Sequence, residues 1–158
     1  MTAESLTERD LQLLQFAIQA AKGSLLAGNI PIAALIADDK SLISIGLNGR
    51  VQRQSMILHA ETAAIENAGR QMVERLRSAT MYCTLSPCPM CTGAILLYKI
   101  PRVVIADRVT HAGQAPLLQE SGVEIVFADD QEAVAIMAEF IRSNPDLWRE
   151  DNGGDPED

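Results

Sequence analysis

The chain has 158 residues, of which 47% are hydrophobic and 22% are charged, with ten glycines and seven prolines. This is the composition of an ordinary globular protein rather than a disordered one, and the length suits one domain over residues 1–158. The net charge of −8 argues against a nucleic-acid-binding surface, because such surfaces use lysine and arginine to displace counterions. We therefore expect a small-molecule partner and no nucleic acid.

Membrane and secretory features are also missing from the pattern. No apolar run approaches the roughly 20 residues that a membrane span needs, and the polar start MTAESLTERD does not resemble a signal peptide. Three cysteines, two of them in a C-x-x-C pair, do not make the disulfide framework of a secreted domain. We expect a cytoplasmic protein whose cysteine pair binds metal or does redox chemistry.

Periodicity predicts the elements in chain order. Residues 7–10 resemble a helix capping box, and apolar residues then recur at helical spacing until Gly28, which predicts a first helix of about five turns. Two apolar runs, 31–37 and 42–47, predict an antiparallel hairpin. The later predicted elements are a helix over 59–73, a strand over 79–84, a helix over 90–98, strands over 102–106 and 124–128, and a helix over 131–142.

The alternation of strands and helices after residue 79 indicates parallel pairing through right-handed crossovers. We therefore predict an α/β domain with three layers, a mixed sheet between helices on both faces. Residues 94–98 are apolar on every side, which indicates a helix buried between the sheet and a neighbouring element, or a helix at a dimer interface. The acidic tail, 152–158, contains glycine and proline and is expected to fray.

Two short segments carry the chemistry, HAE at residues 59–61 and PCPMC at residues 87–91. Imidazole and thiolate are preferred zinc ligands, and the sulfurs of a C-x-x-C pair can share one ion when the second cysteine lies in the first turn of a helix. Ser86 is a candidate N-cap for that helix, and Pro87 suits its first position. The dipole of the helix would favour the thiolate form of both cysteines.

The number of available ligands indicates the kind of zinc site. A structural zinc needs four protein ligands, and beyond the two motifs the chain offers only Cys83 and His111 as further cysteine or histidine. Cys83 lies in a predicted strand, where a small buried thiol is the commoner role. With His59, Cys88 and Cys91 as ligands, one position stays open. We expect one catalytic Zn2+ per chain, with water or hydroxide as its fourth ligand.

Glu61 lies two residues after His59, within reach of that water rather than of the metal, so we predict that it carries protons. An H-x-E segment followed by P-C-x-x-C is the pattern of zinc deaminases. Three other interpretations remain open: an exposed helix glutamate at Glu61, a thioredoxin-like redox pair, and a zinc-stabilised interaction domain with Cys83 or His111 as fourth ligand.

Three stretches, HAETAAIENAGR, TLSPCPMCTGAILLYKIPRVV and NPDLWRED, resemble the fungal-type cytosine deaminases of the cytidine deaminase-like superfamily, with similarity from about residue 16 to residue 151. HAE with PCxxC is shared with guanine deaminases and tRNA adenosine deaminases, whereas TLSPC-x-MCTGAI and the late tryptophan are narrower marks. The resemblance implies a five-stranded mixed sheet, a homodimer, zinc held at His59, Cys88 and Cys91, and Glu61 as the proton shuttle.

The resemblance also implies substrate contacts. Asn48 matches an asparagine that bonds the pyrimidine, Asp151 an aspartate at the amino side of the base, and Trp148 an aromatic that closes the pocket, while the backbone near Ala60 is a further candidate contact. His111 stands where these enzymes have a phenylalanine over the base. Each of these four side chains also has a local interpretation. Asn48 could be a turn residue at 48–49, and Asp151 could be one more acid in the tail. Trp148 could anchor the tail to the core, and His111 could be an exposed loop residue.

These features together predict a hydrolase that acts on a cyclic amidine C–N bond, converting free cytosine to uracil and ammonia. The alternatives are another amino-heterocycle such as guanine or isocytosine, which the polar and titratable His111 leaves open, and tRNA adenosine, which the acidic charge disfavours.

Overall fold

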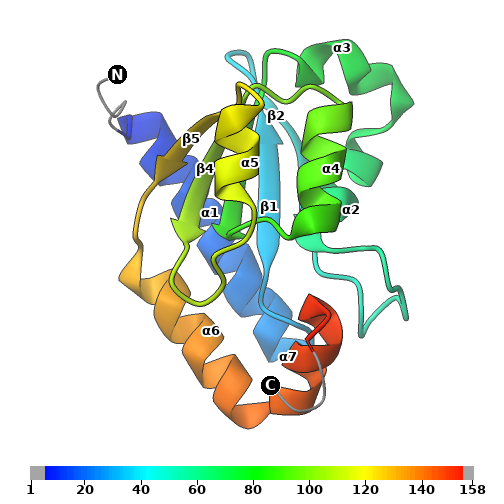
Figure 1. The fold of residues 1–158 in the computed structure, drawn as a ribbon, viewed down its shortest axis with the longest axis vertical. Coiled ribbons are helices and arrows are strands. Elements are labelled where there is room, and N and C mark those ends of the chain that lie inside the picture. Colours follow the sequence, from blue (N-terminus) through cyan, green and yellow to red (C-terminus); the bar gives the residue numbers. More distant parts are fainter. Residues whose placement is uncertain (1–5, 155–158) are drawn as a thin grey trace.

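The computed structural model describes residues 6–154, whose helices and strands alternate along the chain (Figure 1). In chain order the elements are α1 (Glu8–Leu26), β1 (Ala33–Ala37), β2 (Leu42–Leu47), α2 (Ala60–Ala68), the 3-10 helix η1 (Arg70–Met72), α3 (Val73–Leu76), β3 (Thr80–Leu85), α4 (Pro89–Leu97), β4 (Arg102–Asp107), α5 (Ala115–Glu120), β5 (Glu124–Phe127), α6 (Gln131–Ser143) and α7 (Pro145–Asn152).

The strands form one mixed sheet in the order β2-β1-β3-β4-β5. β1 pairs antiparallel with both β2 and β3, whereas β3, β4 and β5 are parallel. The predicted hairpin and the predicted parallel pairing are therefore confirmed. Parallel strands need crossover connections, and α4 and α5 supply them here.

Helices cover both faces of the sheet, which confirms the three-layer architecture (Figure 1). On one face, Leu35 of β1 packs in a cluster with Leu14 and Ile18 of α1. On the other face, Ala34 and Ile36 belong to a larger cluster with residues of α2, α4 and α5. Because successive side chains of a strand point to opposite faces, a strand covered on both sides is apolar throughout, as β1 is.

A glycine lets α2 approach the sheet closely. A Cβ atom on Gly46 of β2 would lie 2.0 Å from the carbonyl oxygen of Ala60 and 2.2 Å from the backbone nitrogen of Ala64. No side chain fits in that space, so the first turns of α2 rest directly on the backbone of β2. This contact fixes where α2 begins, and the HAE segment lies at that point.

Several predicted boundaries were wrong. The helix predicted over 59–73 stops at Ala68, because Gly69 adopts a left-handed φ of 78°, and η1 and α3 follow. Ser86 does not cap α4, whose N-cap is Cys88; the Ser86 hydroxyl donates instead to the carbonyl of Ala112. The short helices α5 and α7 were not predicted.

The C-terminal half of α4 is not buried all round. Ile95 is fully buried, but Leu97 is 70% exposed. The apolar segment 94–98 is therefore only partly buried within the chain. At the end of the chain, α7 extends to Asn152, and residues 155–158 of the acidic tail lie outside the described residues. Within residues 6–154, no helix combines the length and apolarity needed to cross a membrane.

Candidate active site and metal centre

The metal-ligand candidates lie where the N-termini of two helices meet. His59 is the N-cap of α2, and Cys88 is the N-cap of α4, with Pro89 at the first position of the helix. Cys91 follows in the first turn of α4 and is fully buried. Both helices therefore present free backbone N–H groups and the positive end of their dipoles to the site, which stabilises anionic ligands.

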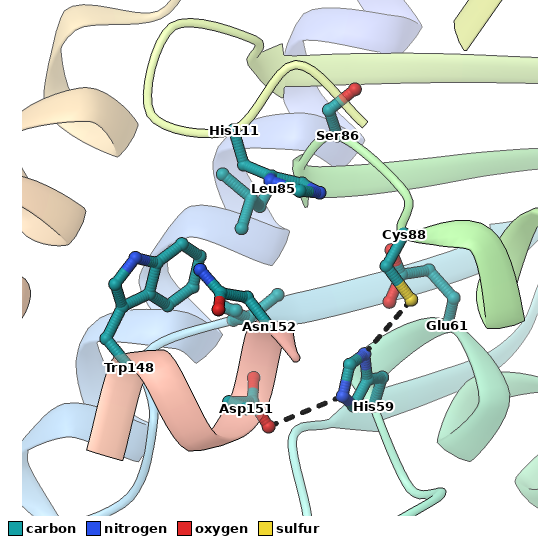
Figure 2. A pocket seen from close by; sticks show the side chains of 10 residues that line it. His59, Glu61, Leu85, Ser86, Cys88, His111, Trp148, Asp151 and Asn152 are labelled. Carbon is teal, nitrogen blue, oxygen red and sulfur yellow. Dashed lines mark hydrogen bonds and ion pairs between the residues drawn. The ribbon is translucent and has the colours of Figure 1, made fainter. Parts of the chain in front are cut away.

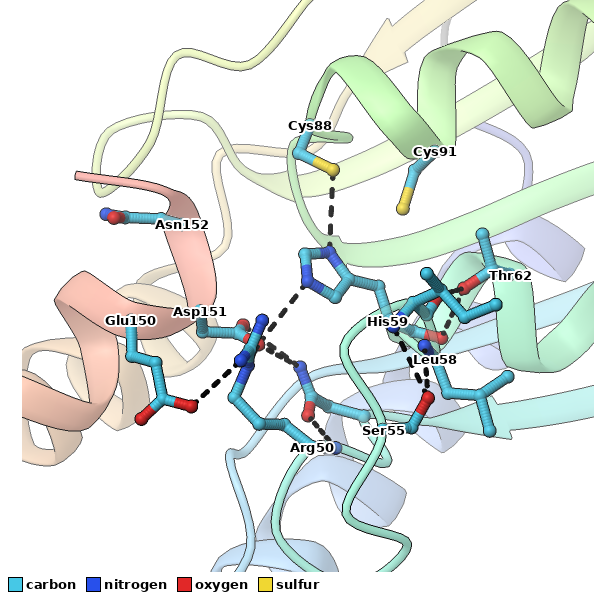
Figure 3. Close-up of polar contacts among 12 residues, drawn as sticks. Arg50, Ser55, Leu58, His59, Thr62, Cys88, Cys91, Glu150, Asp151 and Asn152 are labelled. Atoms are coloured by element: carbon cyan, nitrogen blue, oxygen red, sulfur yellow. Dashed lines mark hydrogen bonds and ion pairs between the residues drawn. The ribbon is translucent and has the colours of Figure 1, made fainter.

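Ligand atoms of His59, Cys88 and Cys91 all lie within 4.8 Å of one another. The Nδ1 atom of His59 is 3.4 Å from the Sγ atom of Cys88 (Figure 3). One imidazole and two thiolates are a donor set that suits zinc. In the part of the chain that the structure describes, no fourth histidine, cysteine or carboxylate joins this group, so neither Cys83 nor His111 is a member.

Glu61 lies beside the cluster and not on the surface, so the exposed-glutamate interpretation was wrong. Its side chain is buried, and its Oε2 atom is 3.3 Å from the Sγ atom of Cys91. Burial raises the pKa of Glu61 to about 7. A carboxyl group whose pKa is close to neutral exchanges protons readily in either direction, which is the property that general acid-base chemistry needs.

Neighbouring groups also set the protonation of the ligands. Hydrogen bonding with the Cys91 thiol, assisted by His59, lowers the pKa of Cys88 to about 4 despite its partial burial. The same contact and burial raise the pKa of Cys91. Burial alone would lower the pKa of His59, but hydrogen bonds with Asp151 and Cys88 raise it to about 10. When only the protein groups are considered, Cys88 therefore loses its proton at a lower pH than Cys91 does.

Asp151 holds His59 from the other side of its ring. The Nε2 atom of His59 is 3.3 Å from the Oδ1 atom of Asp151, so the imidazole lies between a thiol and a carboxylate (Figure 3). The side-chain amide of Asn48 and the guanidinium of Arg50 donate to the same carboxylate, at 3.0 Å and 2.7 Å. Because Asp151 belongs to α7, these bonds attach the C-terminal helix to the metal centre. Carboxylate partners of this kind orient metal-ligating histidines.

A pocket opens at the cluster (Figure 2). Polar groups at one side belong to His59, Glu61, Cys88 and Asp151. The residues that complete its lining are Ile32, Leu85, Ser86, His111, Trp148 and Asn152. A small pocket with an apolar wall and a few convergent polar groups is typical of sites for small molecules.

Comparison with known proteins shows which chemistry this arrangement serves. Residues 7–107 match the cytidine and deoxycytidylate deaminase zinc-binding region, and this match covers more than half of the chain. The chain belongs to the cytidine and deoxycytidylate deaminase family. It is a zinc-dependent deaminase, with His59, Cys88 and Cys91 as the metal-binding triad. The thioredoxin-like and interaction-domain interpretations are therefore set aside.

Individual relatives are similar to this chain over most of its length. A cytosine deaminase from Candida albicans is 46% identical over 149 residues, which cover 94% of this chain and 99% of the relative. A tRNA-specific adenosine deaminase from Streptococcus pyogenes is 38% identical over 114 residues, 72% of each chain. The structure of a guanine deaminase from Nitrosomonas europaea superposes with a TM-score of 0.70 at 18% identity, covering 87% of this chain and 86% of that one, and so shares the fold.

In this deaminase, the structure brings most of the predicted site residues together. His111, Trp148 and Asp151 line the pocket with Glu61 and two members of the zinc triad, His59 and Cys88, and the third member, Cys91, lies beside them in the metal cluster. Asn48 and Ala60 are buried but do not line it; Asn48 donates to Asp151, and its Oδ1 atom also accepts from the backbone N–H of Arg50, as in a turn.

Several residues of the site were not predicted from the sequence. Arg50 was missed because its role depends on Glu150 and Asp151, which lie 100 and 101 residues further along the chain. The apolar wall at Ile32 and Leu85 was missed because each looks like an ordinary core position in or beside a strand. Pro31 before β1 and the end of β3 were the available signals, since strand ends commonly border sites in α/β sheets.

Proposed function

We propose that this deaminase acts on a free nucleobase and converts cytosine to uracil with release of ammonia. The observation that carries the proposal is the similarity to the Candida albicans cytosine deaminase, which extends over 94% of this chain and 99% of that relative. Two further features support it. The pocket is small and partly apolar, and the net charge of −8 disfavours a nucleic-acid substrate.

Glu61 is proposed as the general acid and base of the reaction. Zinc held by the triad would lower the pKa of a water molecule toward neutrality. Glu61 takes up a proton as water adds to the amino-bearing carbon and gives it to the adjacent ring nitrogen. It then takes the proton of the new hydroxyl group and gives it to the departing amine, so that ammonia leaves and a carbonyl remains. Its burial beside Cys91 and its pKa of about 7 suit each of these transfers.

The remaining predicted residues are proposed to position the base. Asp151 faces the pocket with a carboxylate already oriented by Asn48, and it would accept a hydrogen bond from the amino group of the base. Trp148 and His111 would enclose the ring from the opposite wall. The roles of Asp151, Trp148 and His111 follow from their positions in the pocket and from the family resemblance. A contact between the backbone at Ala60 and the edge of the base follows from the resemblance alone.

The reaction is tested with zinc-loaded protein and a panel of cytosine, isocytosine, guanine, adenine, creatinine and free nucleosides, with ammonia release as the readout. Cytosine should be active, with about one zinc bound per chain. Glu61→Gln should keep the zinc but lose about 10²- to 10⁴-fold in kcat, the usual contribution of general acid-base catalysis. Glu120→Gln, an exposed position at the end of α5, is the matched control.

Two results would contradict parts of this proposal separately. Turnover of another ring without turnover of cytosine would overturn the substrate. Full activity of Glu61→Gln would overturn the role of Glu61 and leave the substrate assignment intact.

We further propose that residues 1–158 form a single deaminase domain that acts in the cytoplasm as a homodimer. The three cysteines are free, which suits a reducing compartment. Exposed apolar side chains lie at the C-terminal end of α4, at Leu97 and at the C-cap Tyr98. Tyr98 borders a groove shared with Ile65 of α2 and Val73 of α3. An exposed apolar surface of this kind marks an interface, and a second copy would cover it.

A further inference from the structure

The loop that carries His111 is fixed where it leaves β4. The buried carboxylate of Asp107 accepts hydrogen bonds from the backbone N–H groups of Val109 and Thr110, at 2.8 Å and 3.0 Å. The guanidinium of Arg108 packs 4.2 Å from the centre of the Phe127 ring. The first half of the loop therefore has a defined conformation, tied to strands β4 and β5.

The second half of the loop is fixed against the segment that leads to Cys88. The Ser86 hydroxyl donates to the carbonyl of Ala112, and the N–H of Gln114 donates to the carbonyl of Pro87, each at 3.0 Å. Gly113 has a φ of 60°, and a Cβ atom there would lie 2.6 Å from the Pro87 carbonyl oxygen. His111 is thus held between two anchored ends, next to the zinc-binding segment.

The ring of His111 has a polar atom that the protein does not use. His111 lines the pocket, and its ring meets that of Trp148 edge to face, with centroids 6.3 Å apart and an interplanar angle of 83° (Figure 2). Its Nε2 atom is buried and has no hydrogen-bond partner among the described residues. A buried polar atom without a partner costs free energy, so a partner from the ligand would be used if the ligand offered one.

The neighbours of His111 indicate which edge of the base it meets. Leu85 and Trp148 lie on the same wall and are apolar, whereas the acidic groups of Glu61 and Asp151 lie toward the metal centre (Figure 2). In cytosine the C5–C6 edge carries only hydrogen, and every other ring position bears or is a nitrogen or an oxygen. The polar atoms of the base can form hydrogen bonds with Glu61 and Asp151. The carbon edge of the base therefore faces the wall that contains His111.

We infer that the substrates of this site include amino-pyrimidines with a hydrogen-bonding substituent on the carbon edge, such as 5-hydroxymethylcytosine, and that His111 is the residue that selects them. The inference rests on the proposed function. The Nε2 atom of His111 supplies the hydrogen bond to the substituent, and the anchored loop holds the imidazole in place for it. A methyl group at the same position would leave Nε2 without a partner.

The test compares kcat/KM for cytosine, 5-methylcytosine and 5-hydroxymethylcytosine with zinc-loaded wild-type protein, His111→Phe and His111→Gln. The ratio of hydroxymethyl to methyl substrate is the measured quantity, because a general loss of activity cancels from it. Wild-type protein should prefer the hydroxymethyl base by about fivefold to tenfold, the effect of one neutral hydrogen bond. His111→Phe should prefer the methyl base, and His111→Gln should keep the wild-type preference.

Binding of the products gives a second measurement that does not depend on turnover. Wild-type protein should bind 5-hydroxymethyluracil more tightly than thymine, and His111→Phe should reverse the order. Zinc content and thermal melting show that each variant is folded; if His111→Phe does not fold, the wild-type ratios and His111→Gln decide the question.

Three outcomes would overturn the inference. The first is an equal ratio in wild-type protein and His111→Phe, and the second is a wild-type preference for the methyl base. The third is turnover of cytosine with no turnover of either substituted base. Absence of turnover with every pyrimidine would instead overturn the proposed function, and this inference with it.

Discussion

At the scale of single residues, Arg50 shows how the site depends on contacts beyond its motif. Its Nε atom donates to Asp151 at 2.7 Å, and its Nη1 atom donates to Glu150 at 2.9 Å. The Arg50 side chain is only 11% exposed, so these are charge-assisted bonds in a partly dry setting. Arg50 thereby fixes Asp151, which in turn contacts His59. We regard Arg50 as a positioning residue for the metal centre and for α7.

Replacing Arg50 with methionine should therefore raise KM for the base by about tenfold or more, the effect of losing a hydrogen bond to a charged group. It should change kcat less than KM, because Glu61 and the zinc triad stay in place. Lys would rescue only part of the loss, since one ammonium cannot reproduce the fork of a guanidinium. Loosening of α7 should also shift the fluorescence of Trp148, the only tryptophan in the chain.

The control is Arg53→Met, an exposed position in the same loop. Equal kinetics and equal tryptophan emission in Arg50→Met and Arg53→Met would show that Arg50 does not position α7. A merely structural effect would lower stability without moving KM.

The site residues that could be predicted from the sequence are those whose motifs lie within a few residues of one another. His59, Glu61, Cys88 and Cys91 were identified because each pair lies within one helical turn, so spacing alone indicates shared chemistry. Arg50 was missed because no local spacing links it to α7. The partner of a long-range hydrogen bond is chosen by the tertiary fold, which a pattern within a few residues does not describe.

At the scale of elements, α1 is tied to the sheet by one carboxylate. Asp10 accepts from Thr7 in a capping box, from the hydroxyl of Tyr82 at 2.9 Å, and from two nitrogens of Arg102 at 2.8 Å and 3.0 Å. Burial would raise the pKa of Asp10, but the hydrogen bonds from Arg102, Thr7 and Tyr82 hold it well below its usual value. The folded state thus stabilises the ionised form of Asp10 more than the unfolded state does.

A depressed pKa in the folded state stabilises the fold above the pKa of the unfolded carboxyl, about 3.9, and this stabilisation is lost as the pH falls further. Asp10→Asn should accordingly lower the free energy of unfolding by roughly 2–3 kcal/mol at pH 7. The difference from wild type should narrow below about pH 4. Urea unfolding at pH 7 and pH 3 measures it, with Glu8→Gln on the exposed face of α1 as control. An equal difference in the free energy of unfolding between wild type and Asp10→Asn at both pH values would contradict this account.

The success of the element predictions depended on length and regularity. The long helix α1 and the apolar strands were predicted because their periodicity extends over many residues and agrees with their burial. The six-residue α5 and the polar α7 were missed because each is short and begins at or beside a proline in a stretch that resembles a loop. The helix predicted over 59–73 was too long because its apolar pattern continues past the true end at Ala68. The pattern describes only side chains, whereas the helix ends because the backbone of Gly69 has a positive φ.

At the scale of the whole molecule, the apolar end of α4 is the feature that the single chain does not explain. Leu97 is 70% exposed, and the neighbouring Tyr98 borders the groove with α2 and α3. The same helix begins at the zinc ligands Cys88 and Cys91, so contacts made at its C-terminal end bear on an element that also holds the metal. A homodimer that buries this surface would stabilise the site from outside.

Leu97→Glu places a charge where a partner would exclude water, and it should convert the proposed dimer to monomer at micromolar concentration. The matched control is Leu26→Glu, because Leu26 is 91% exposed at the end of α1 and lies outside the proposed interface. Sedimentation velocity distinguishes the two outcomes. Monomeric wild-type protein would contradict the proposed dimer. A Leu97→Glu variant that dimerises as well as Leu26→Glu would show that the interface lies elsewhere. Should Leu97→Glu also bind zinc less tightly, the dimer contact and the metal centre would be coupled through α4, as their shared helix implies.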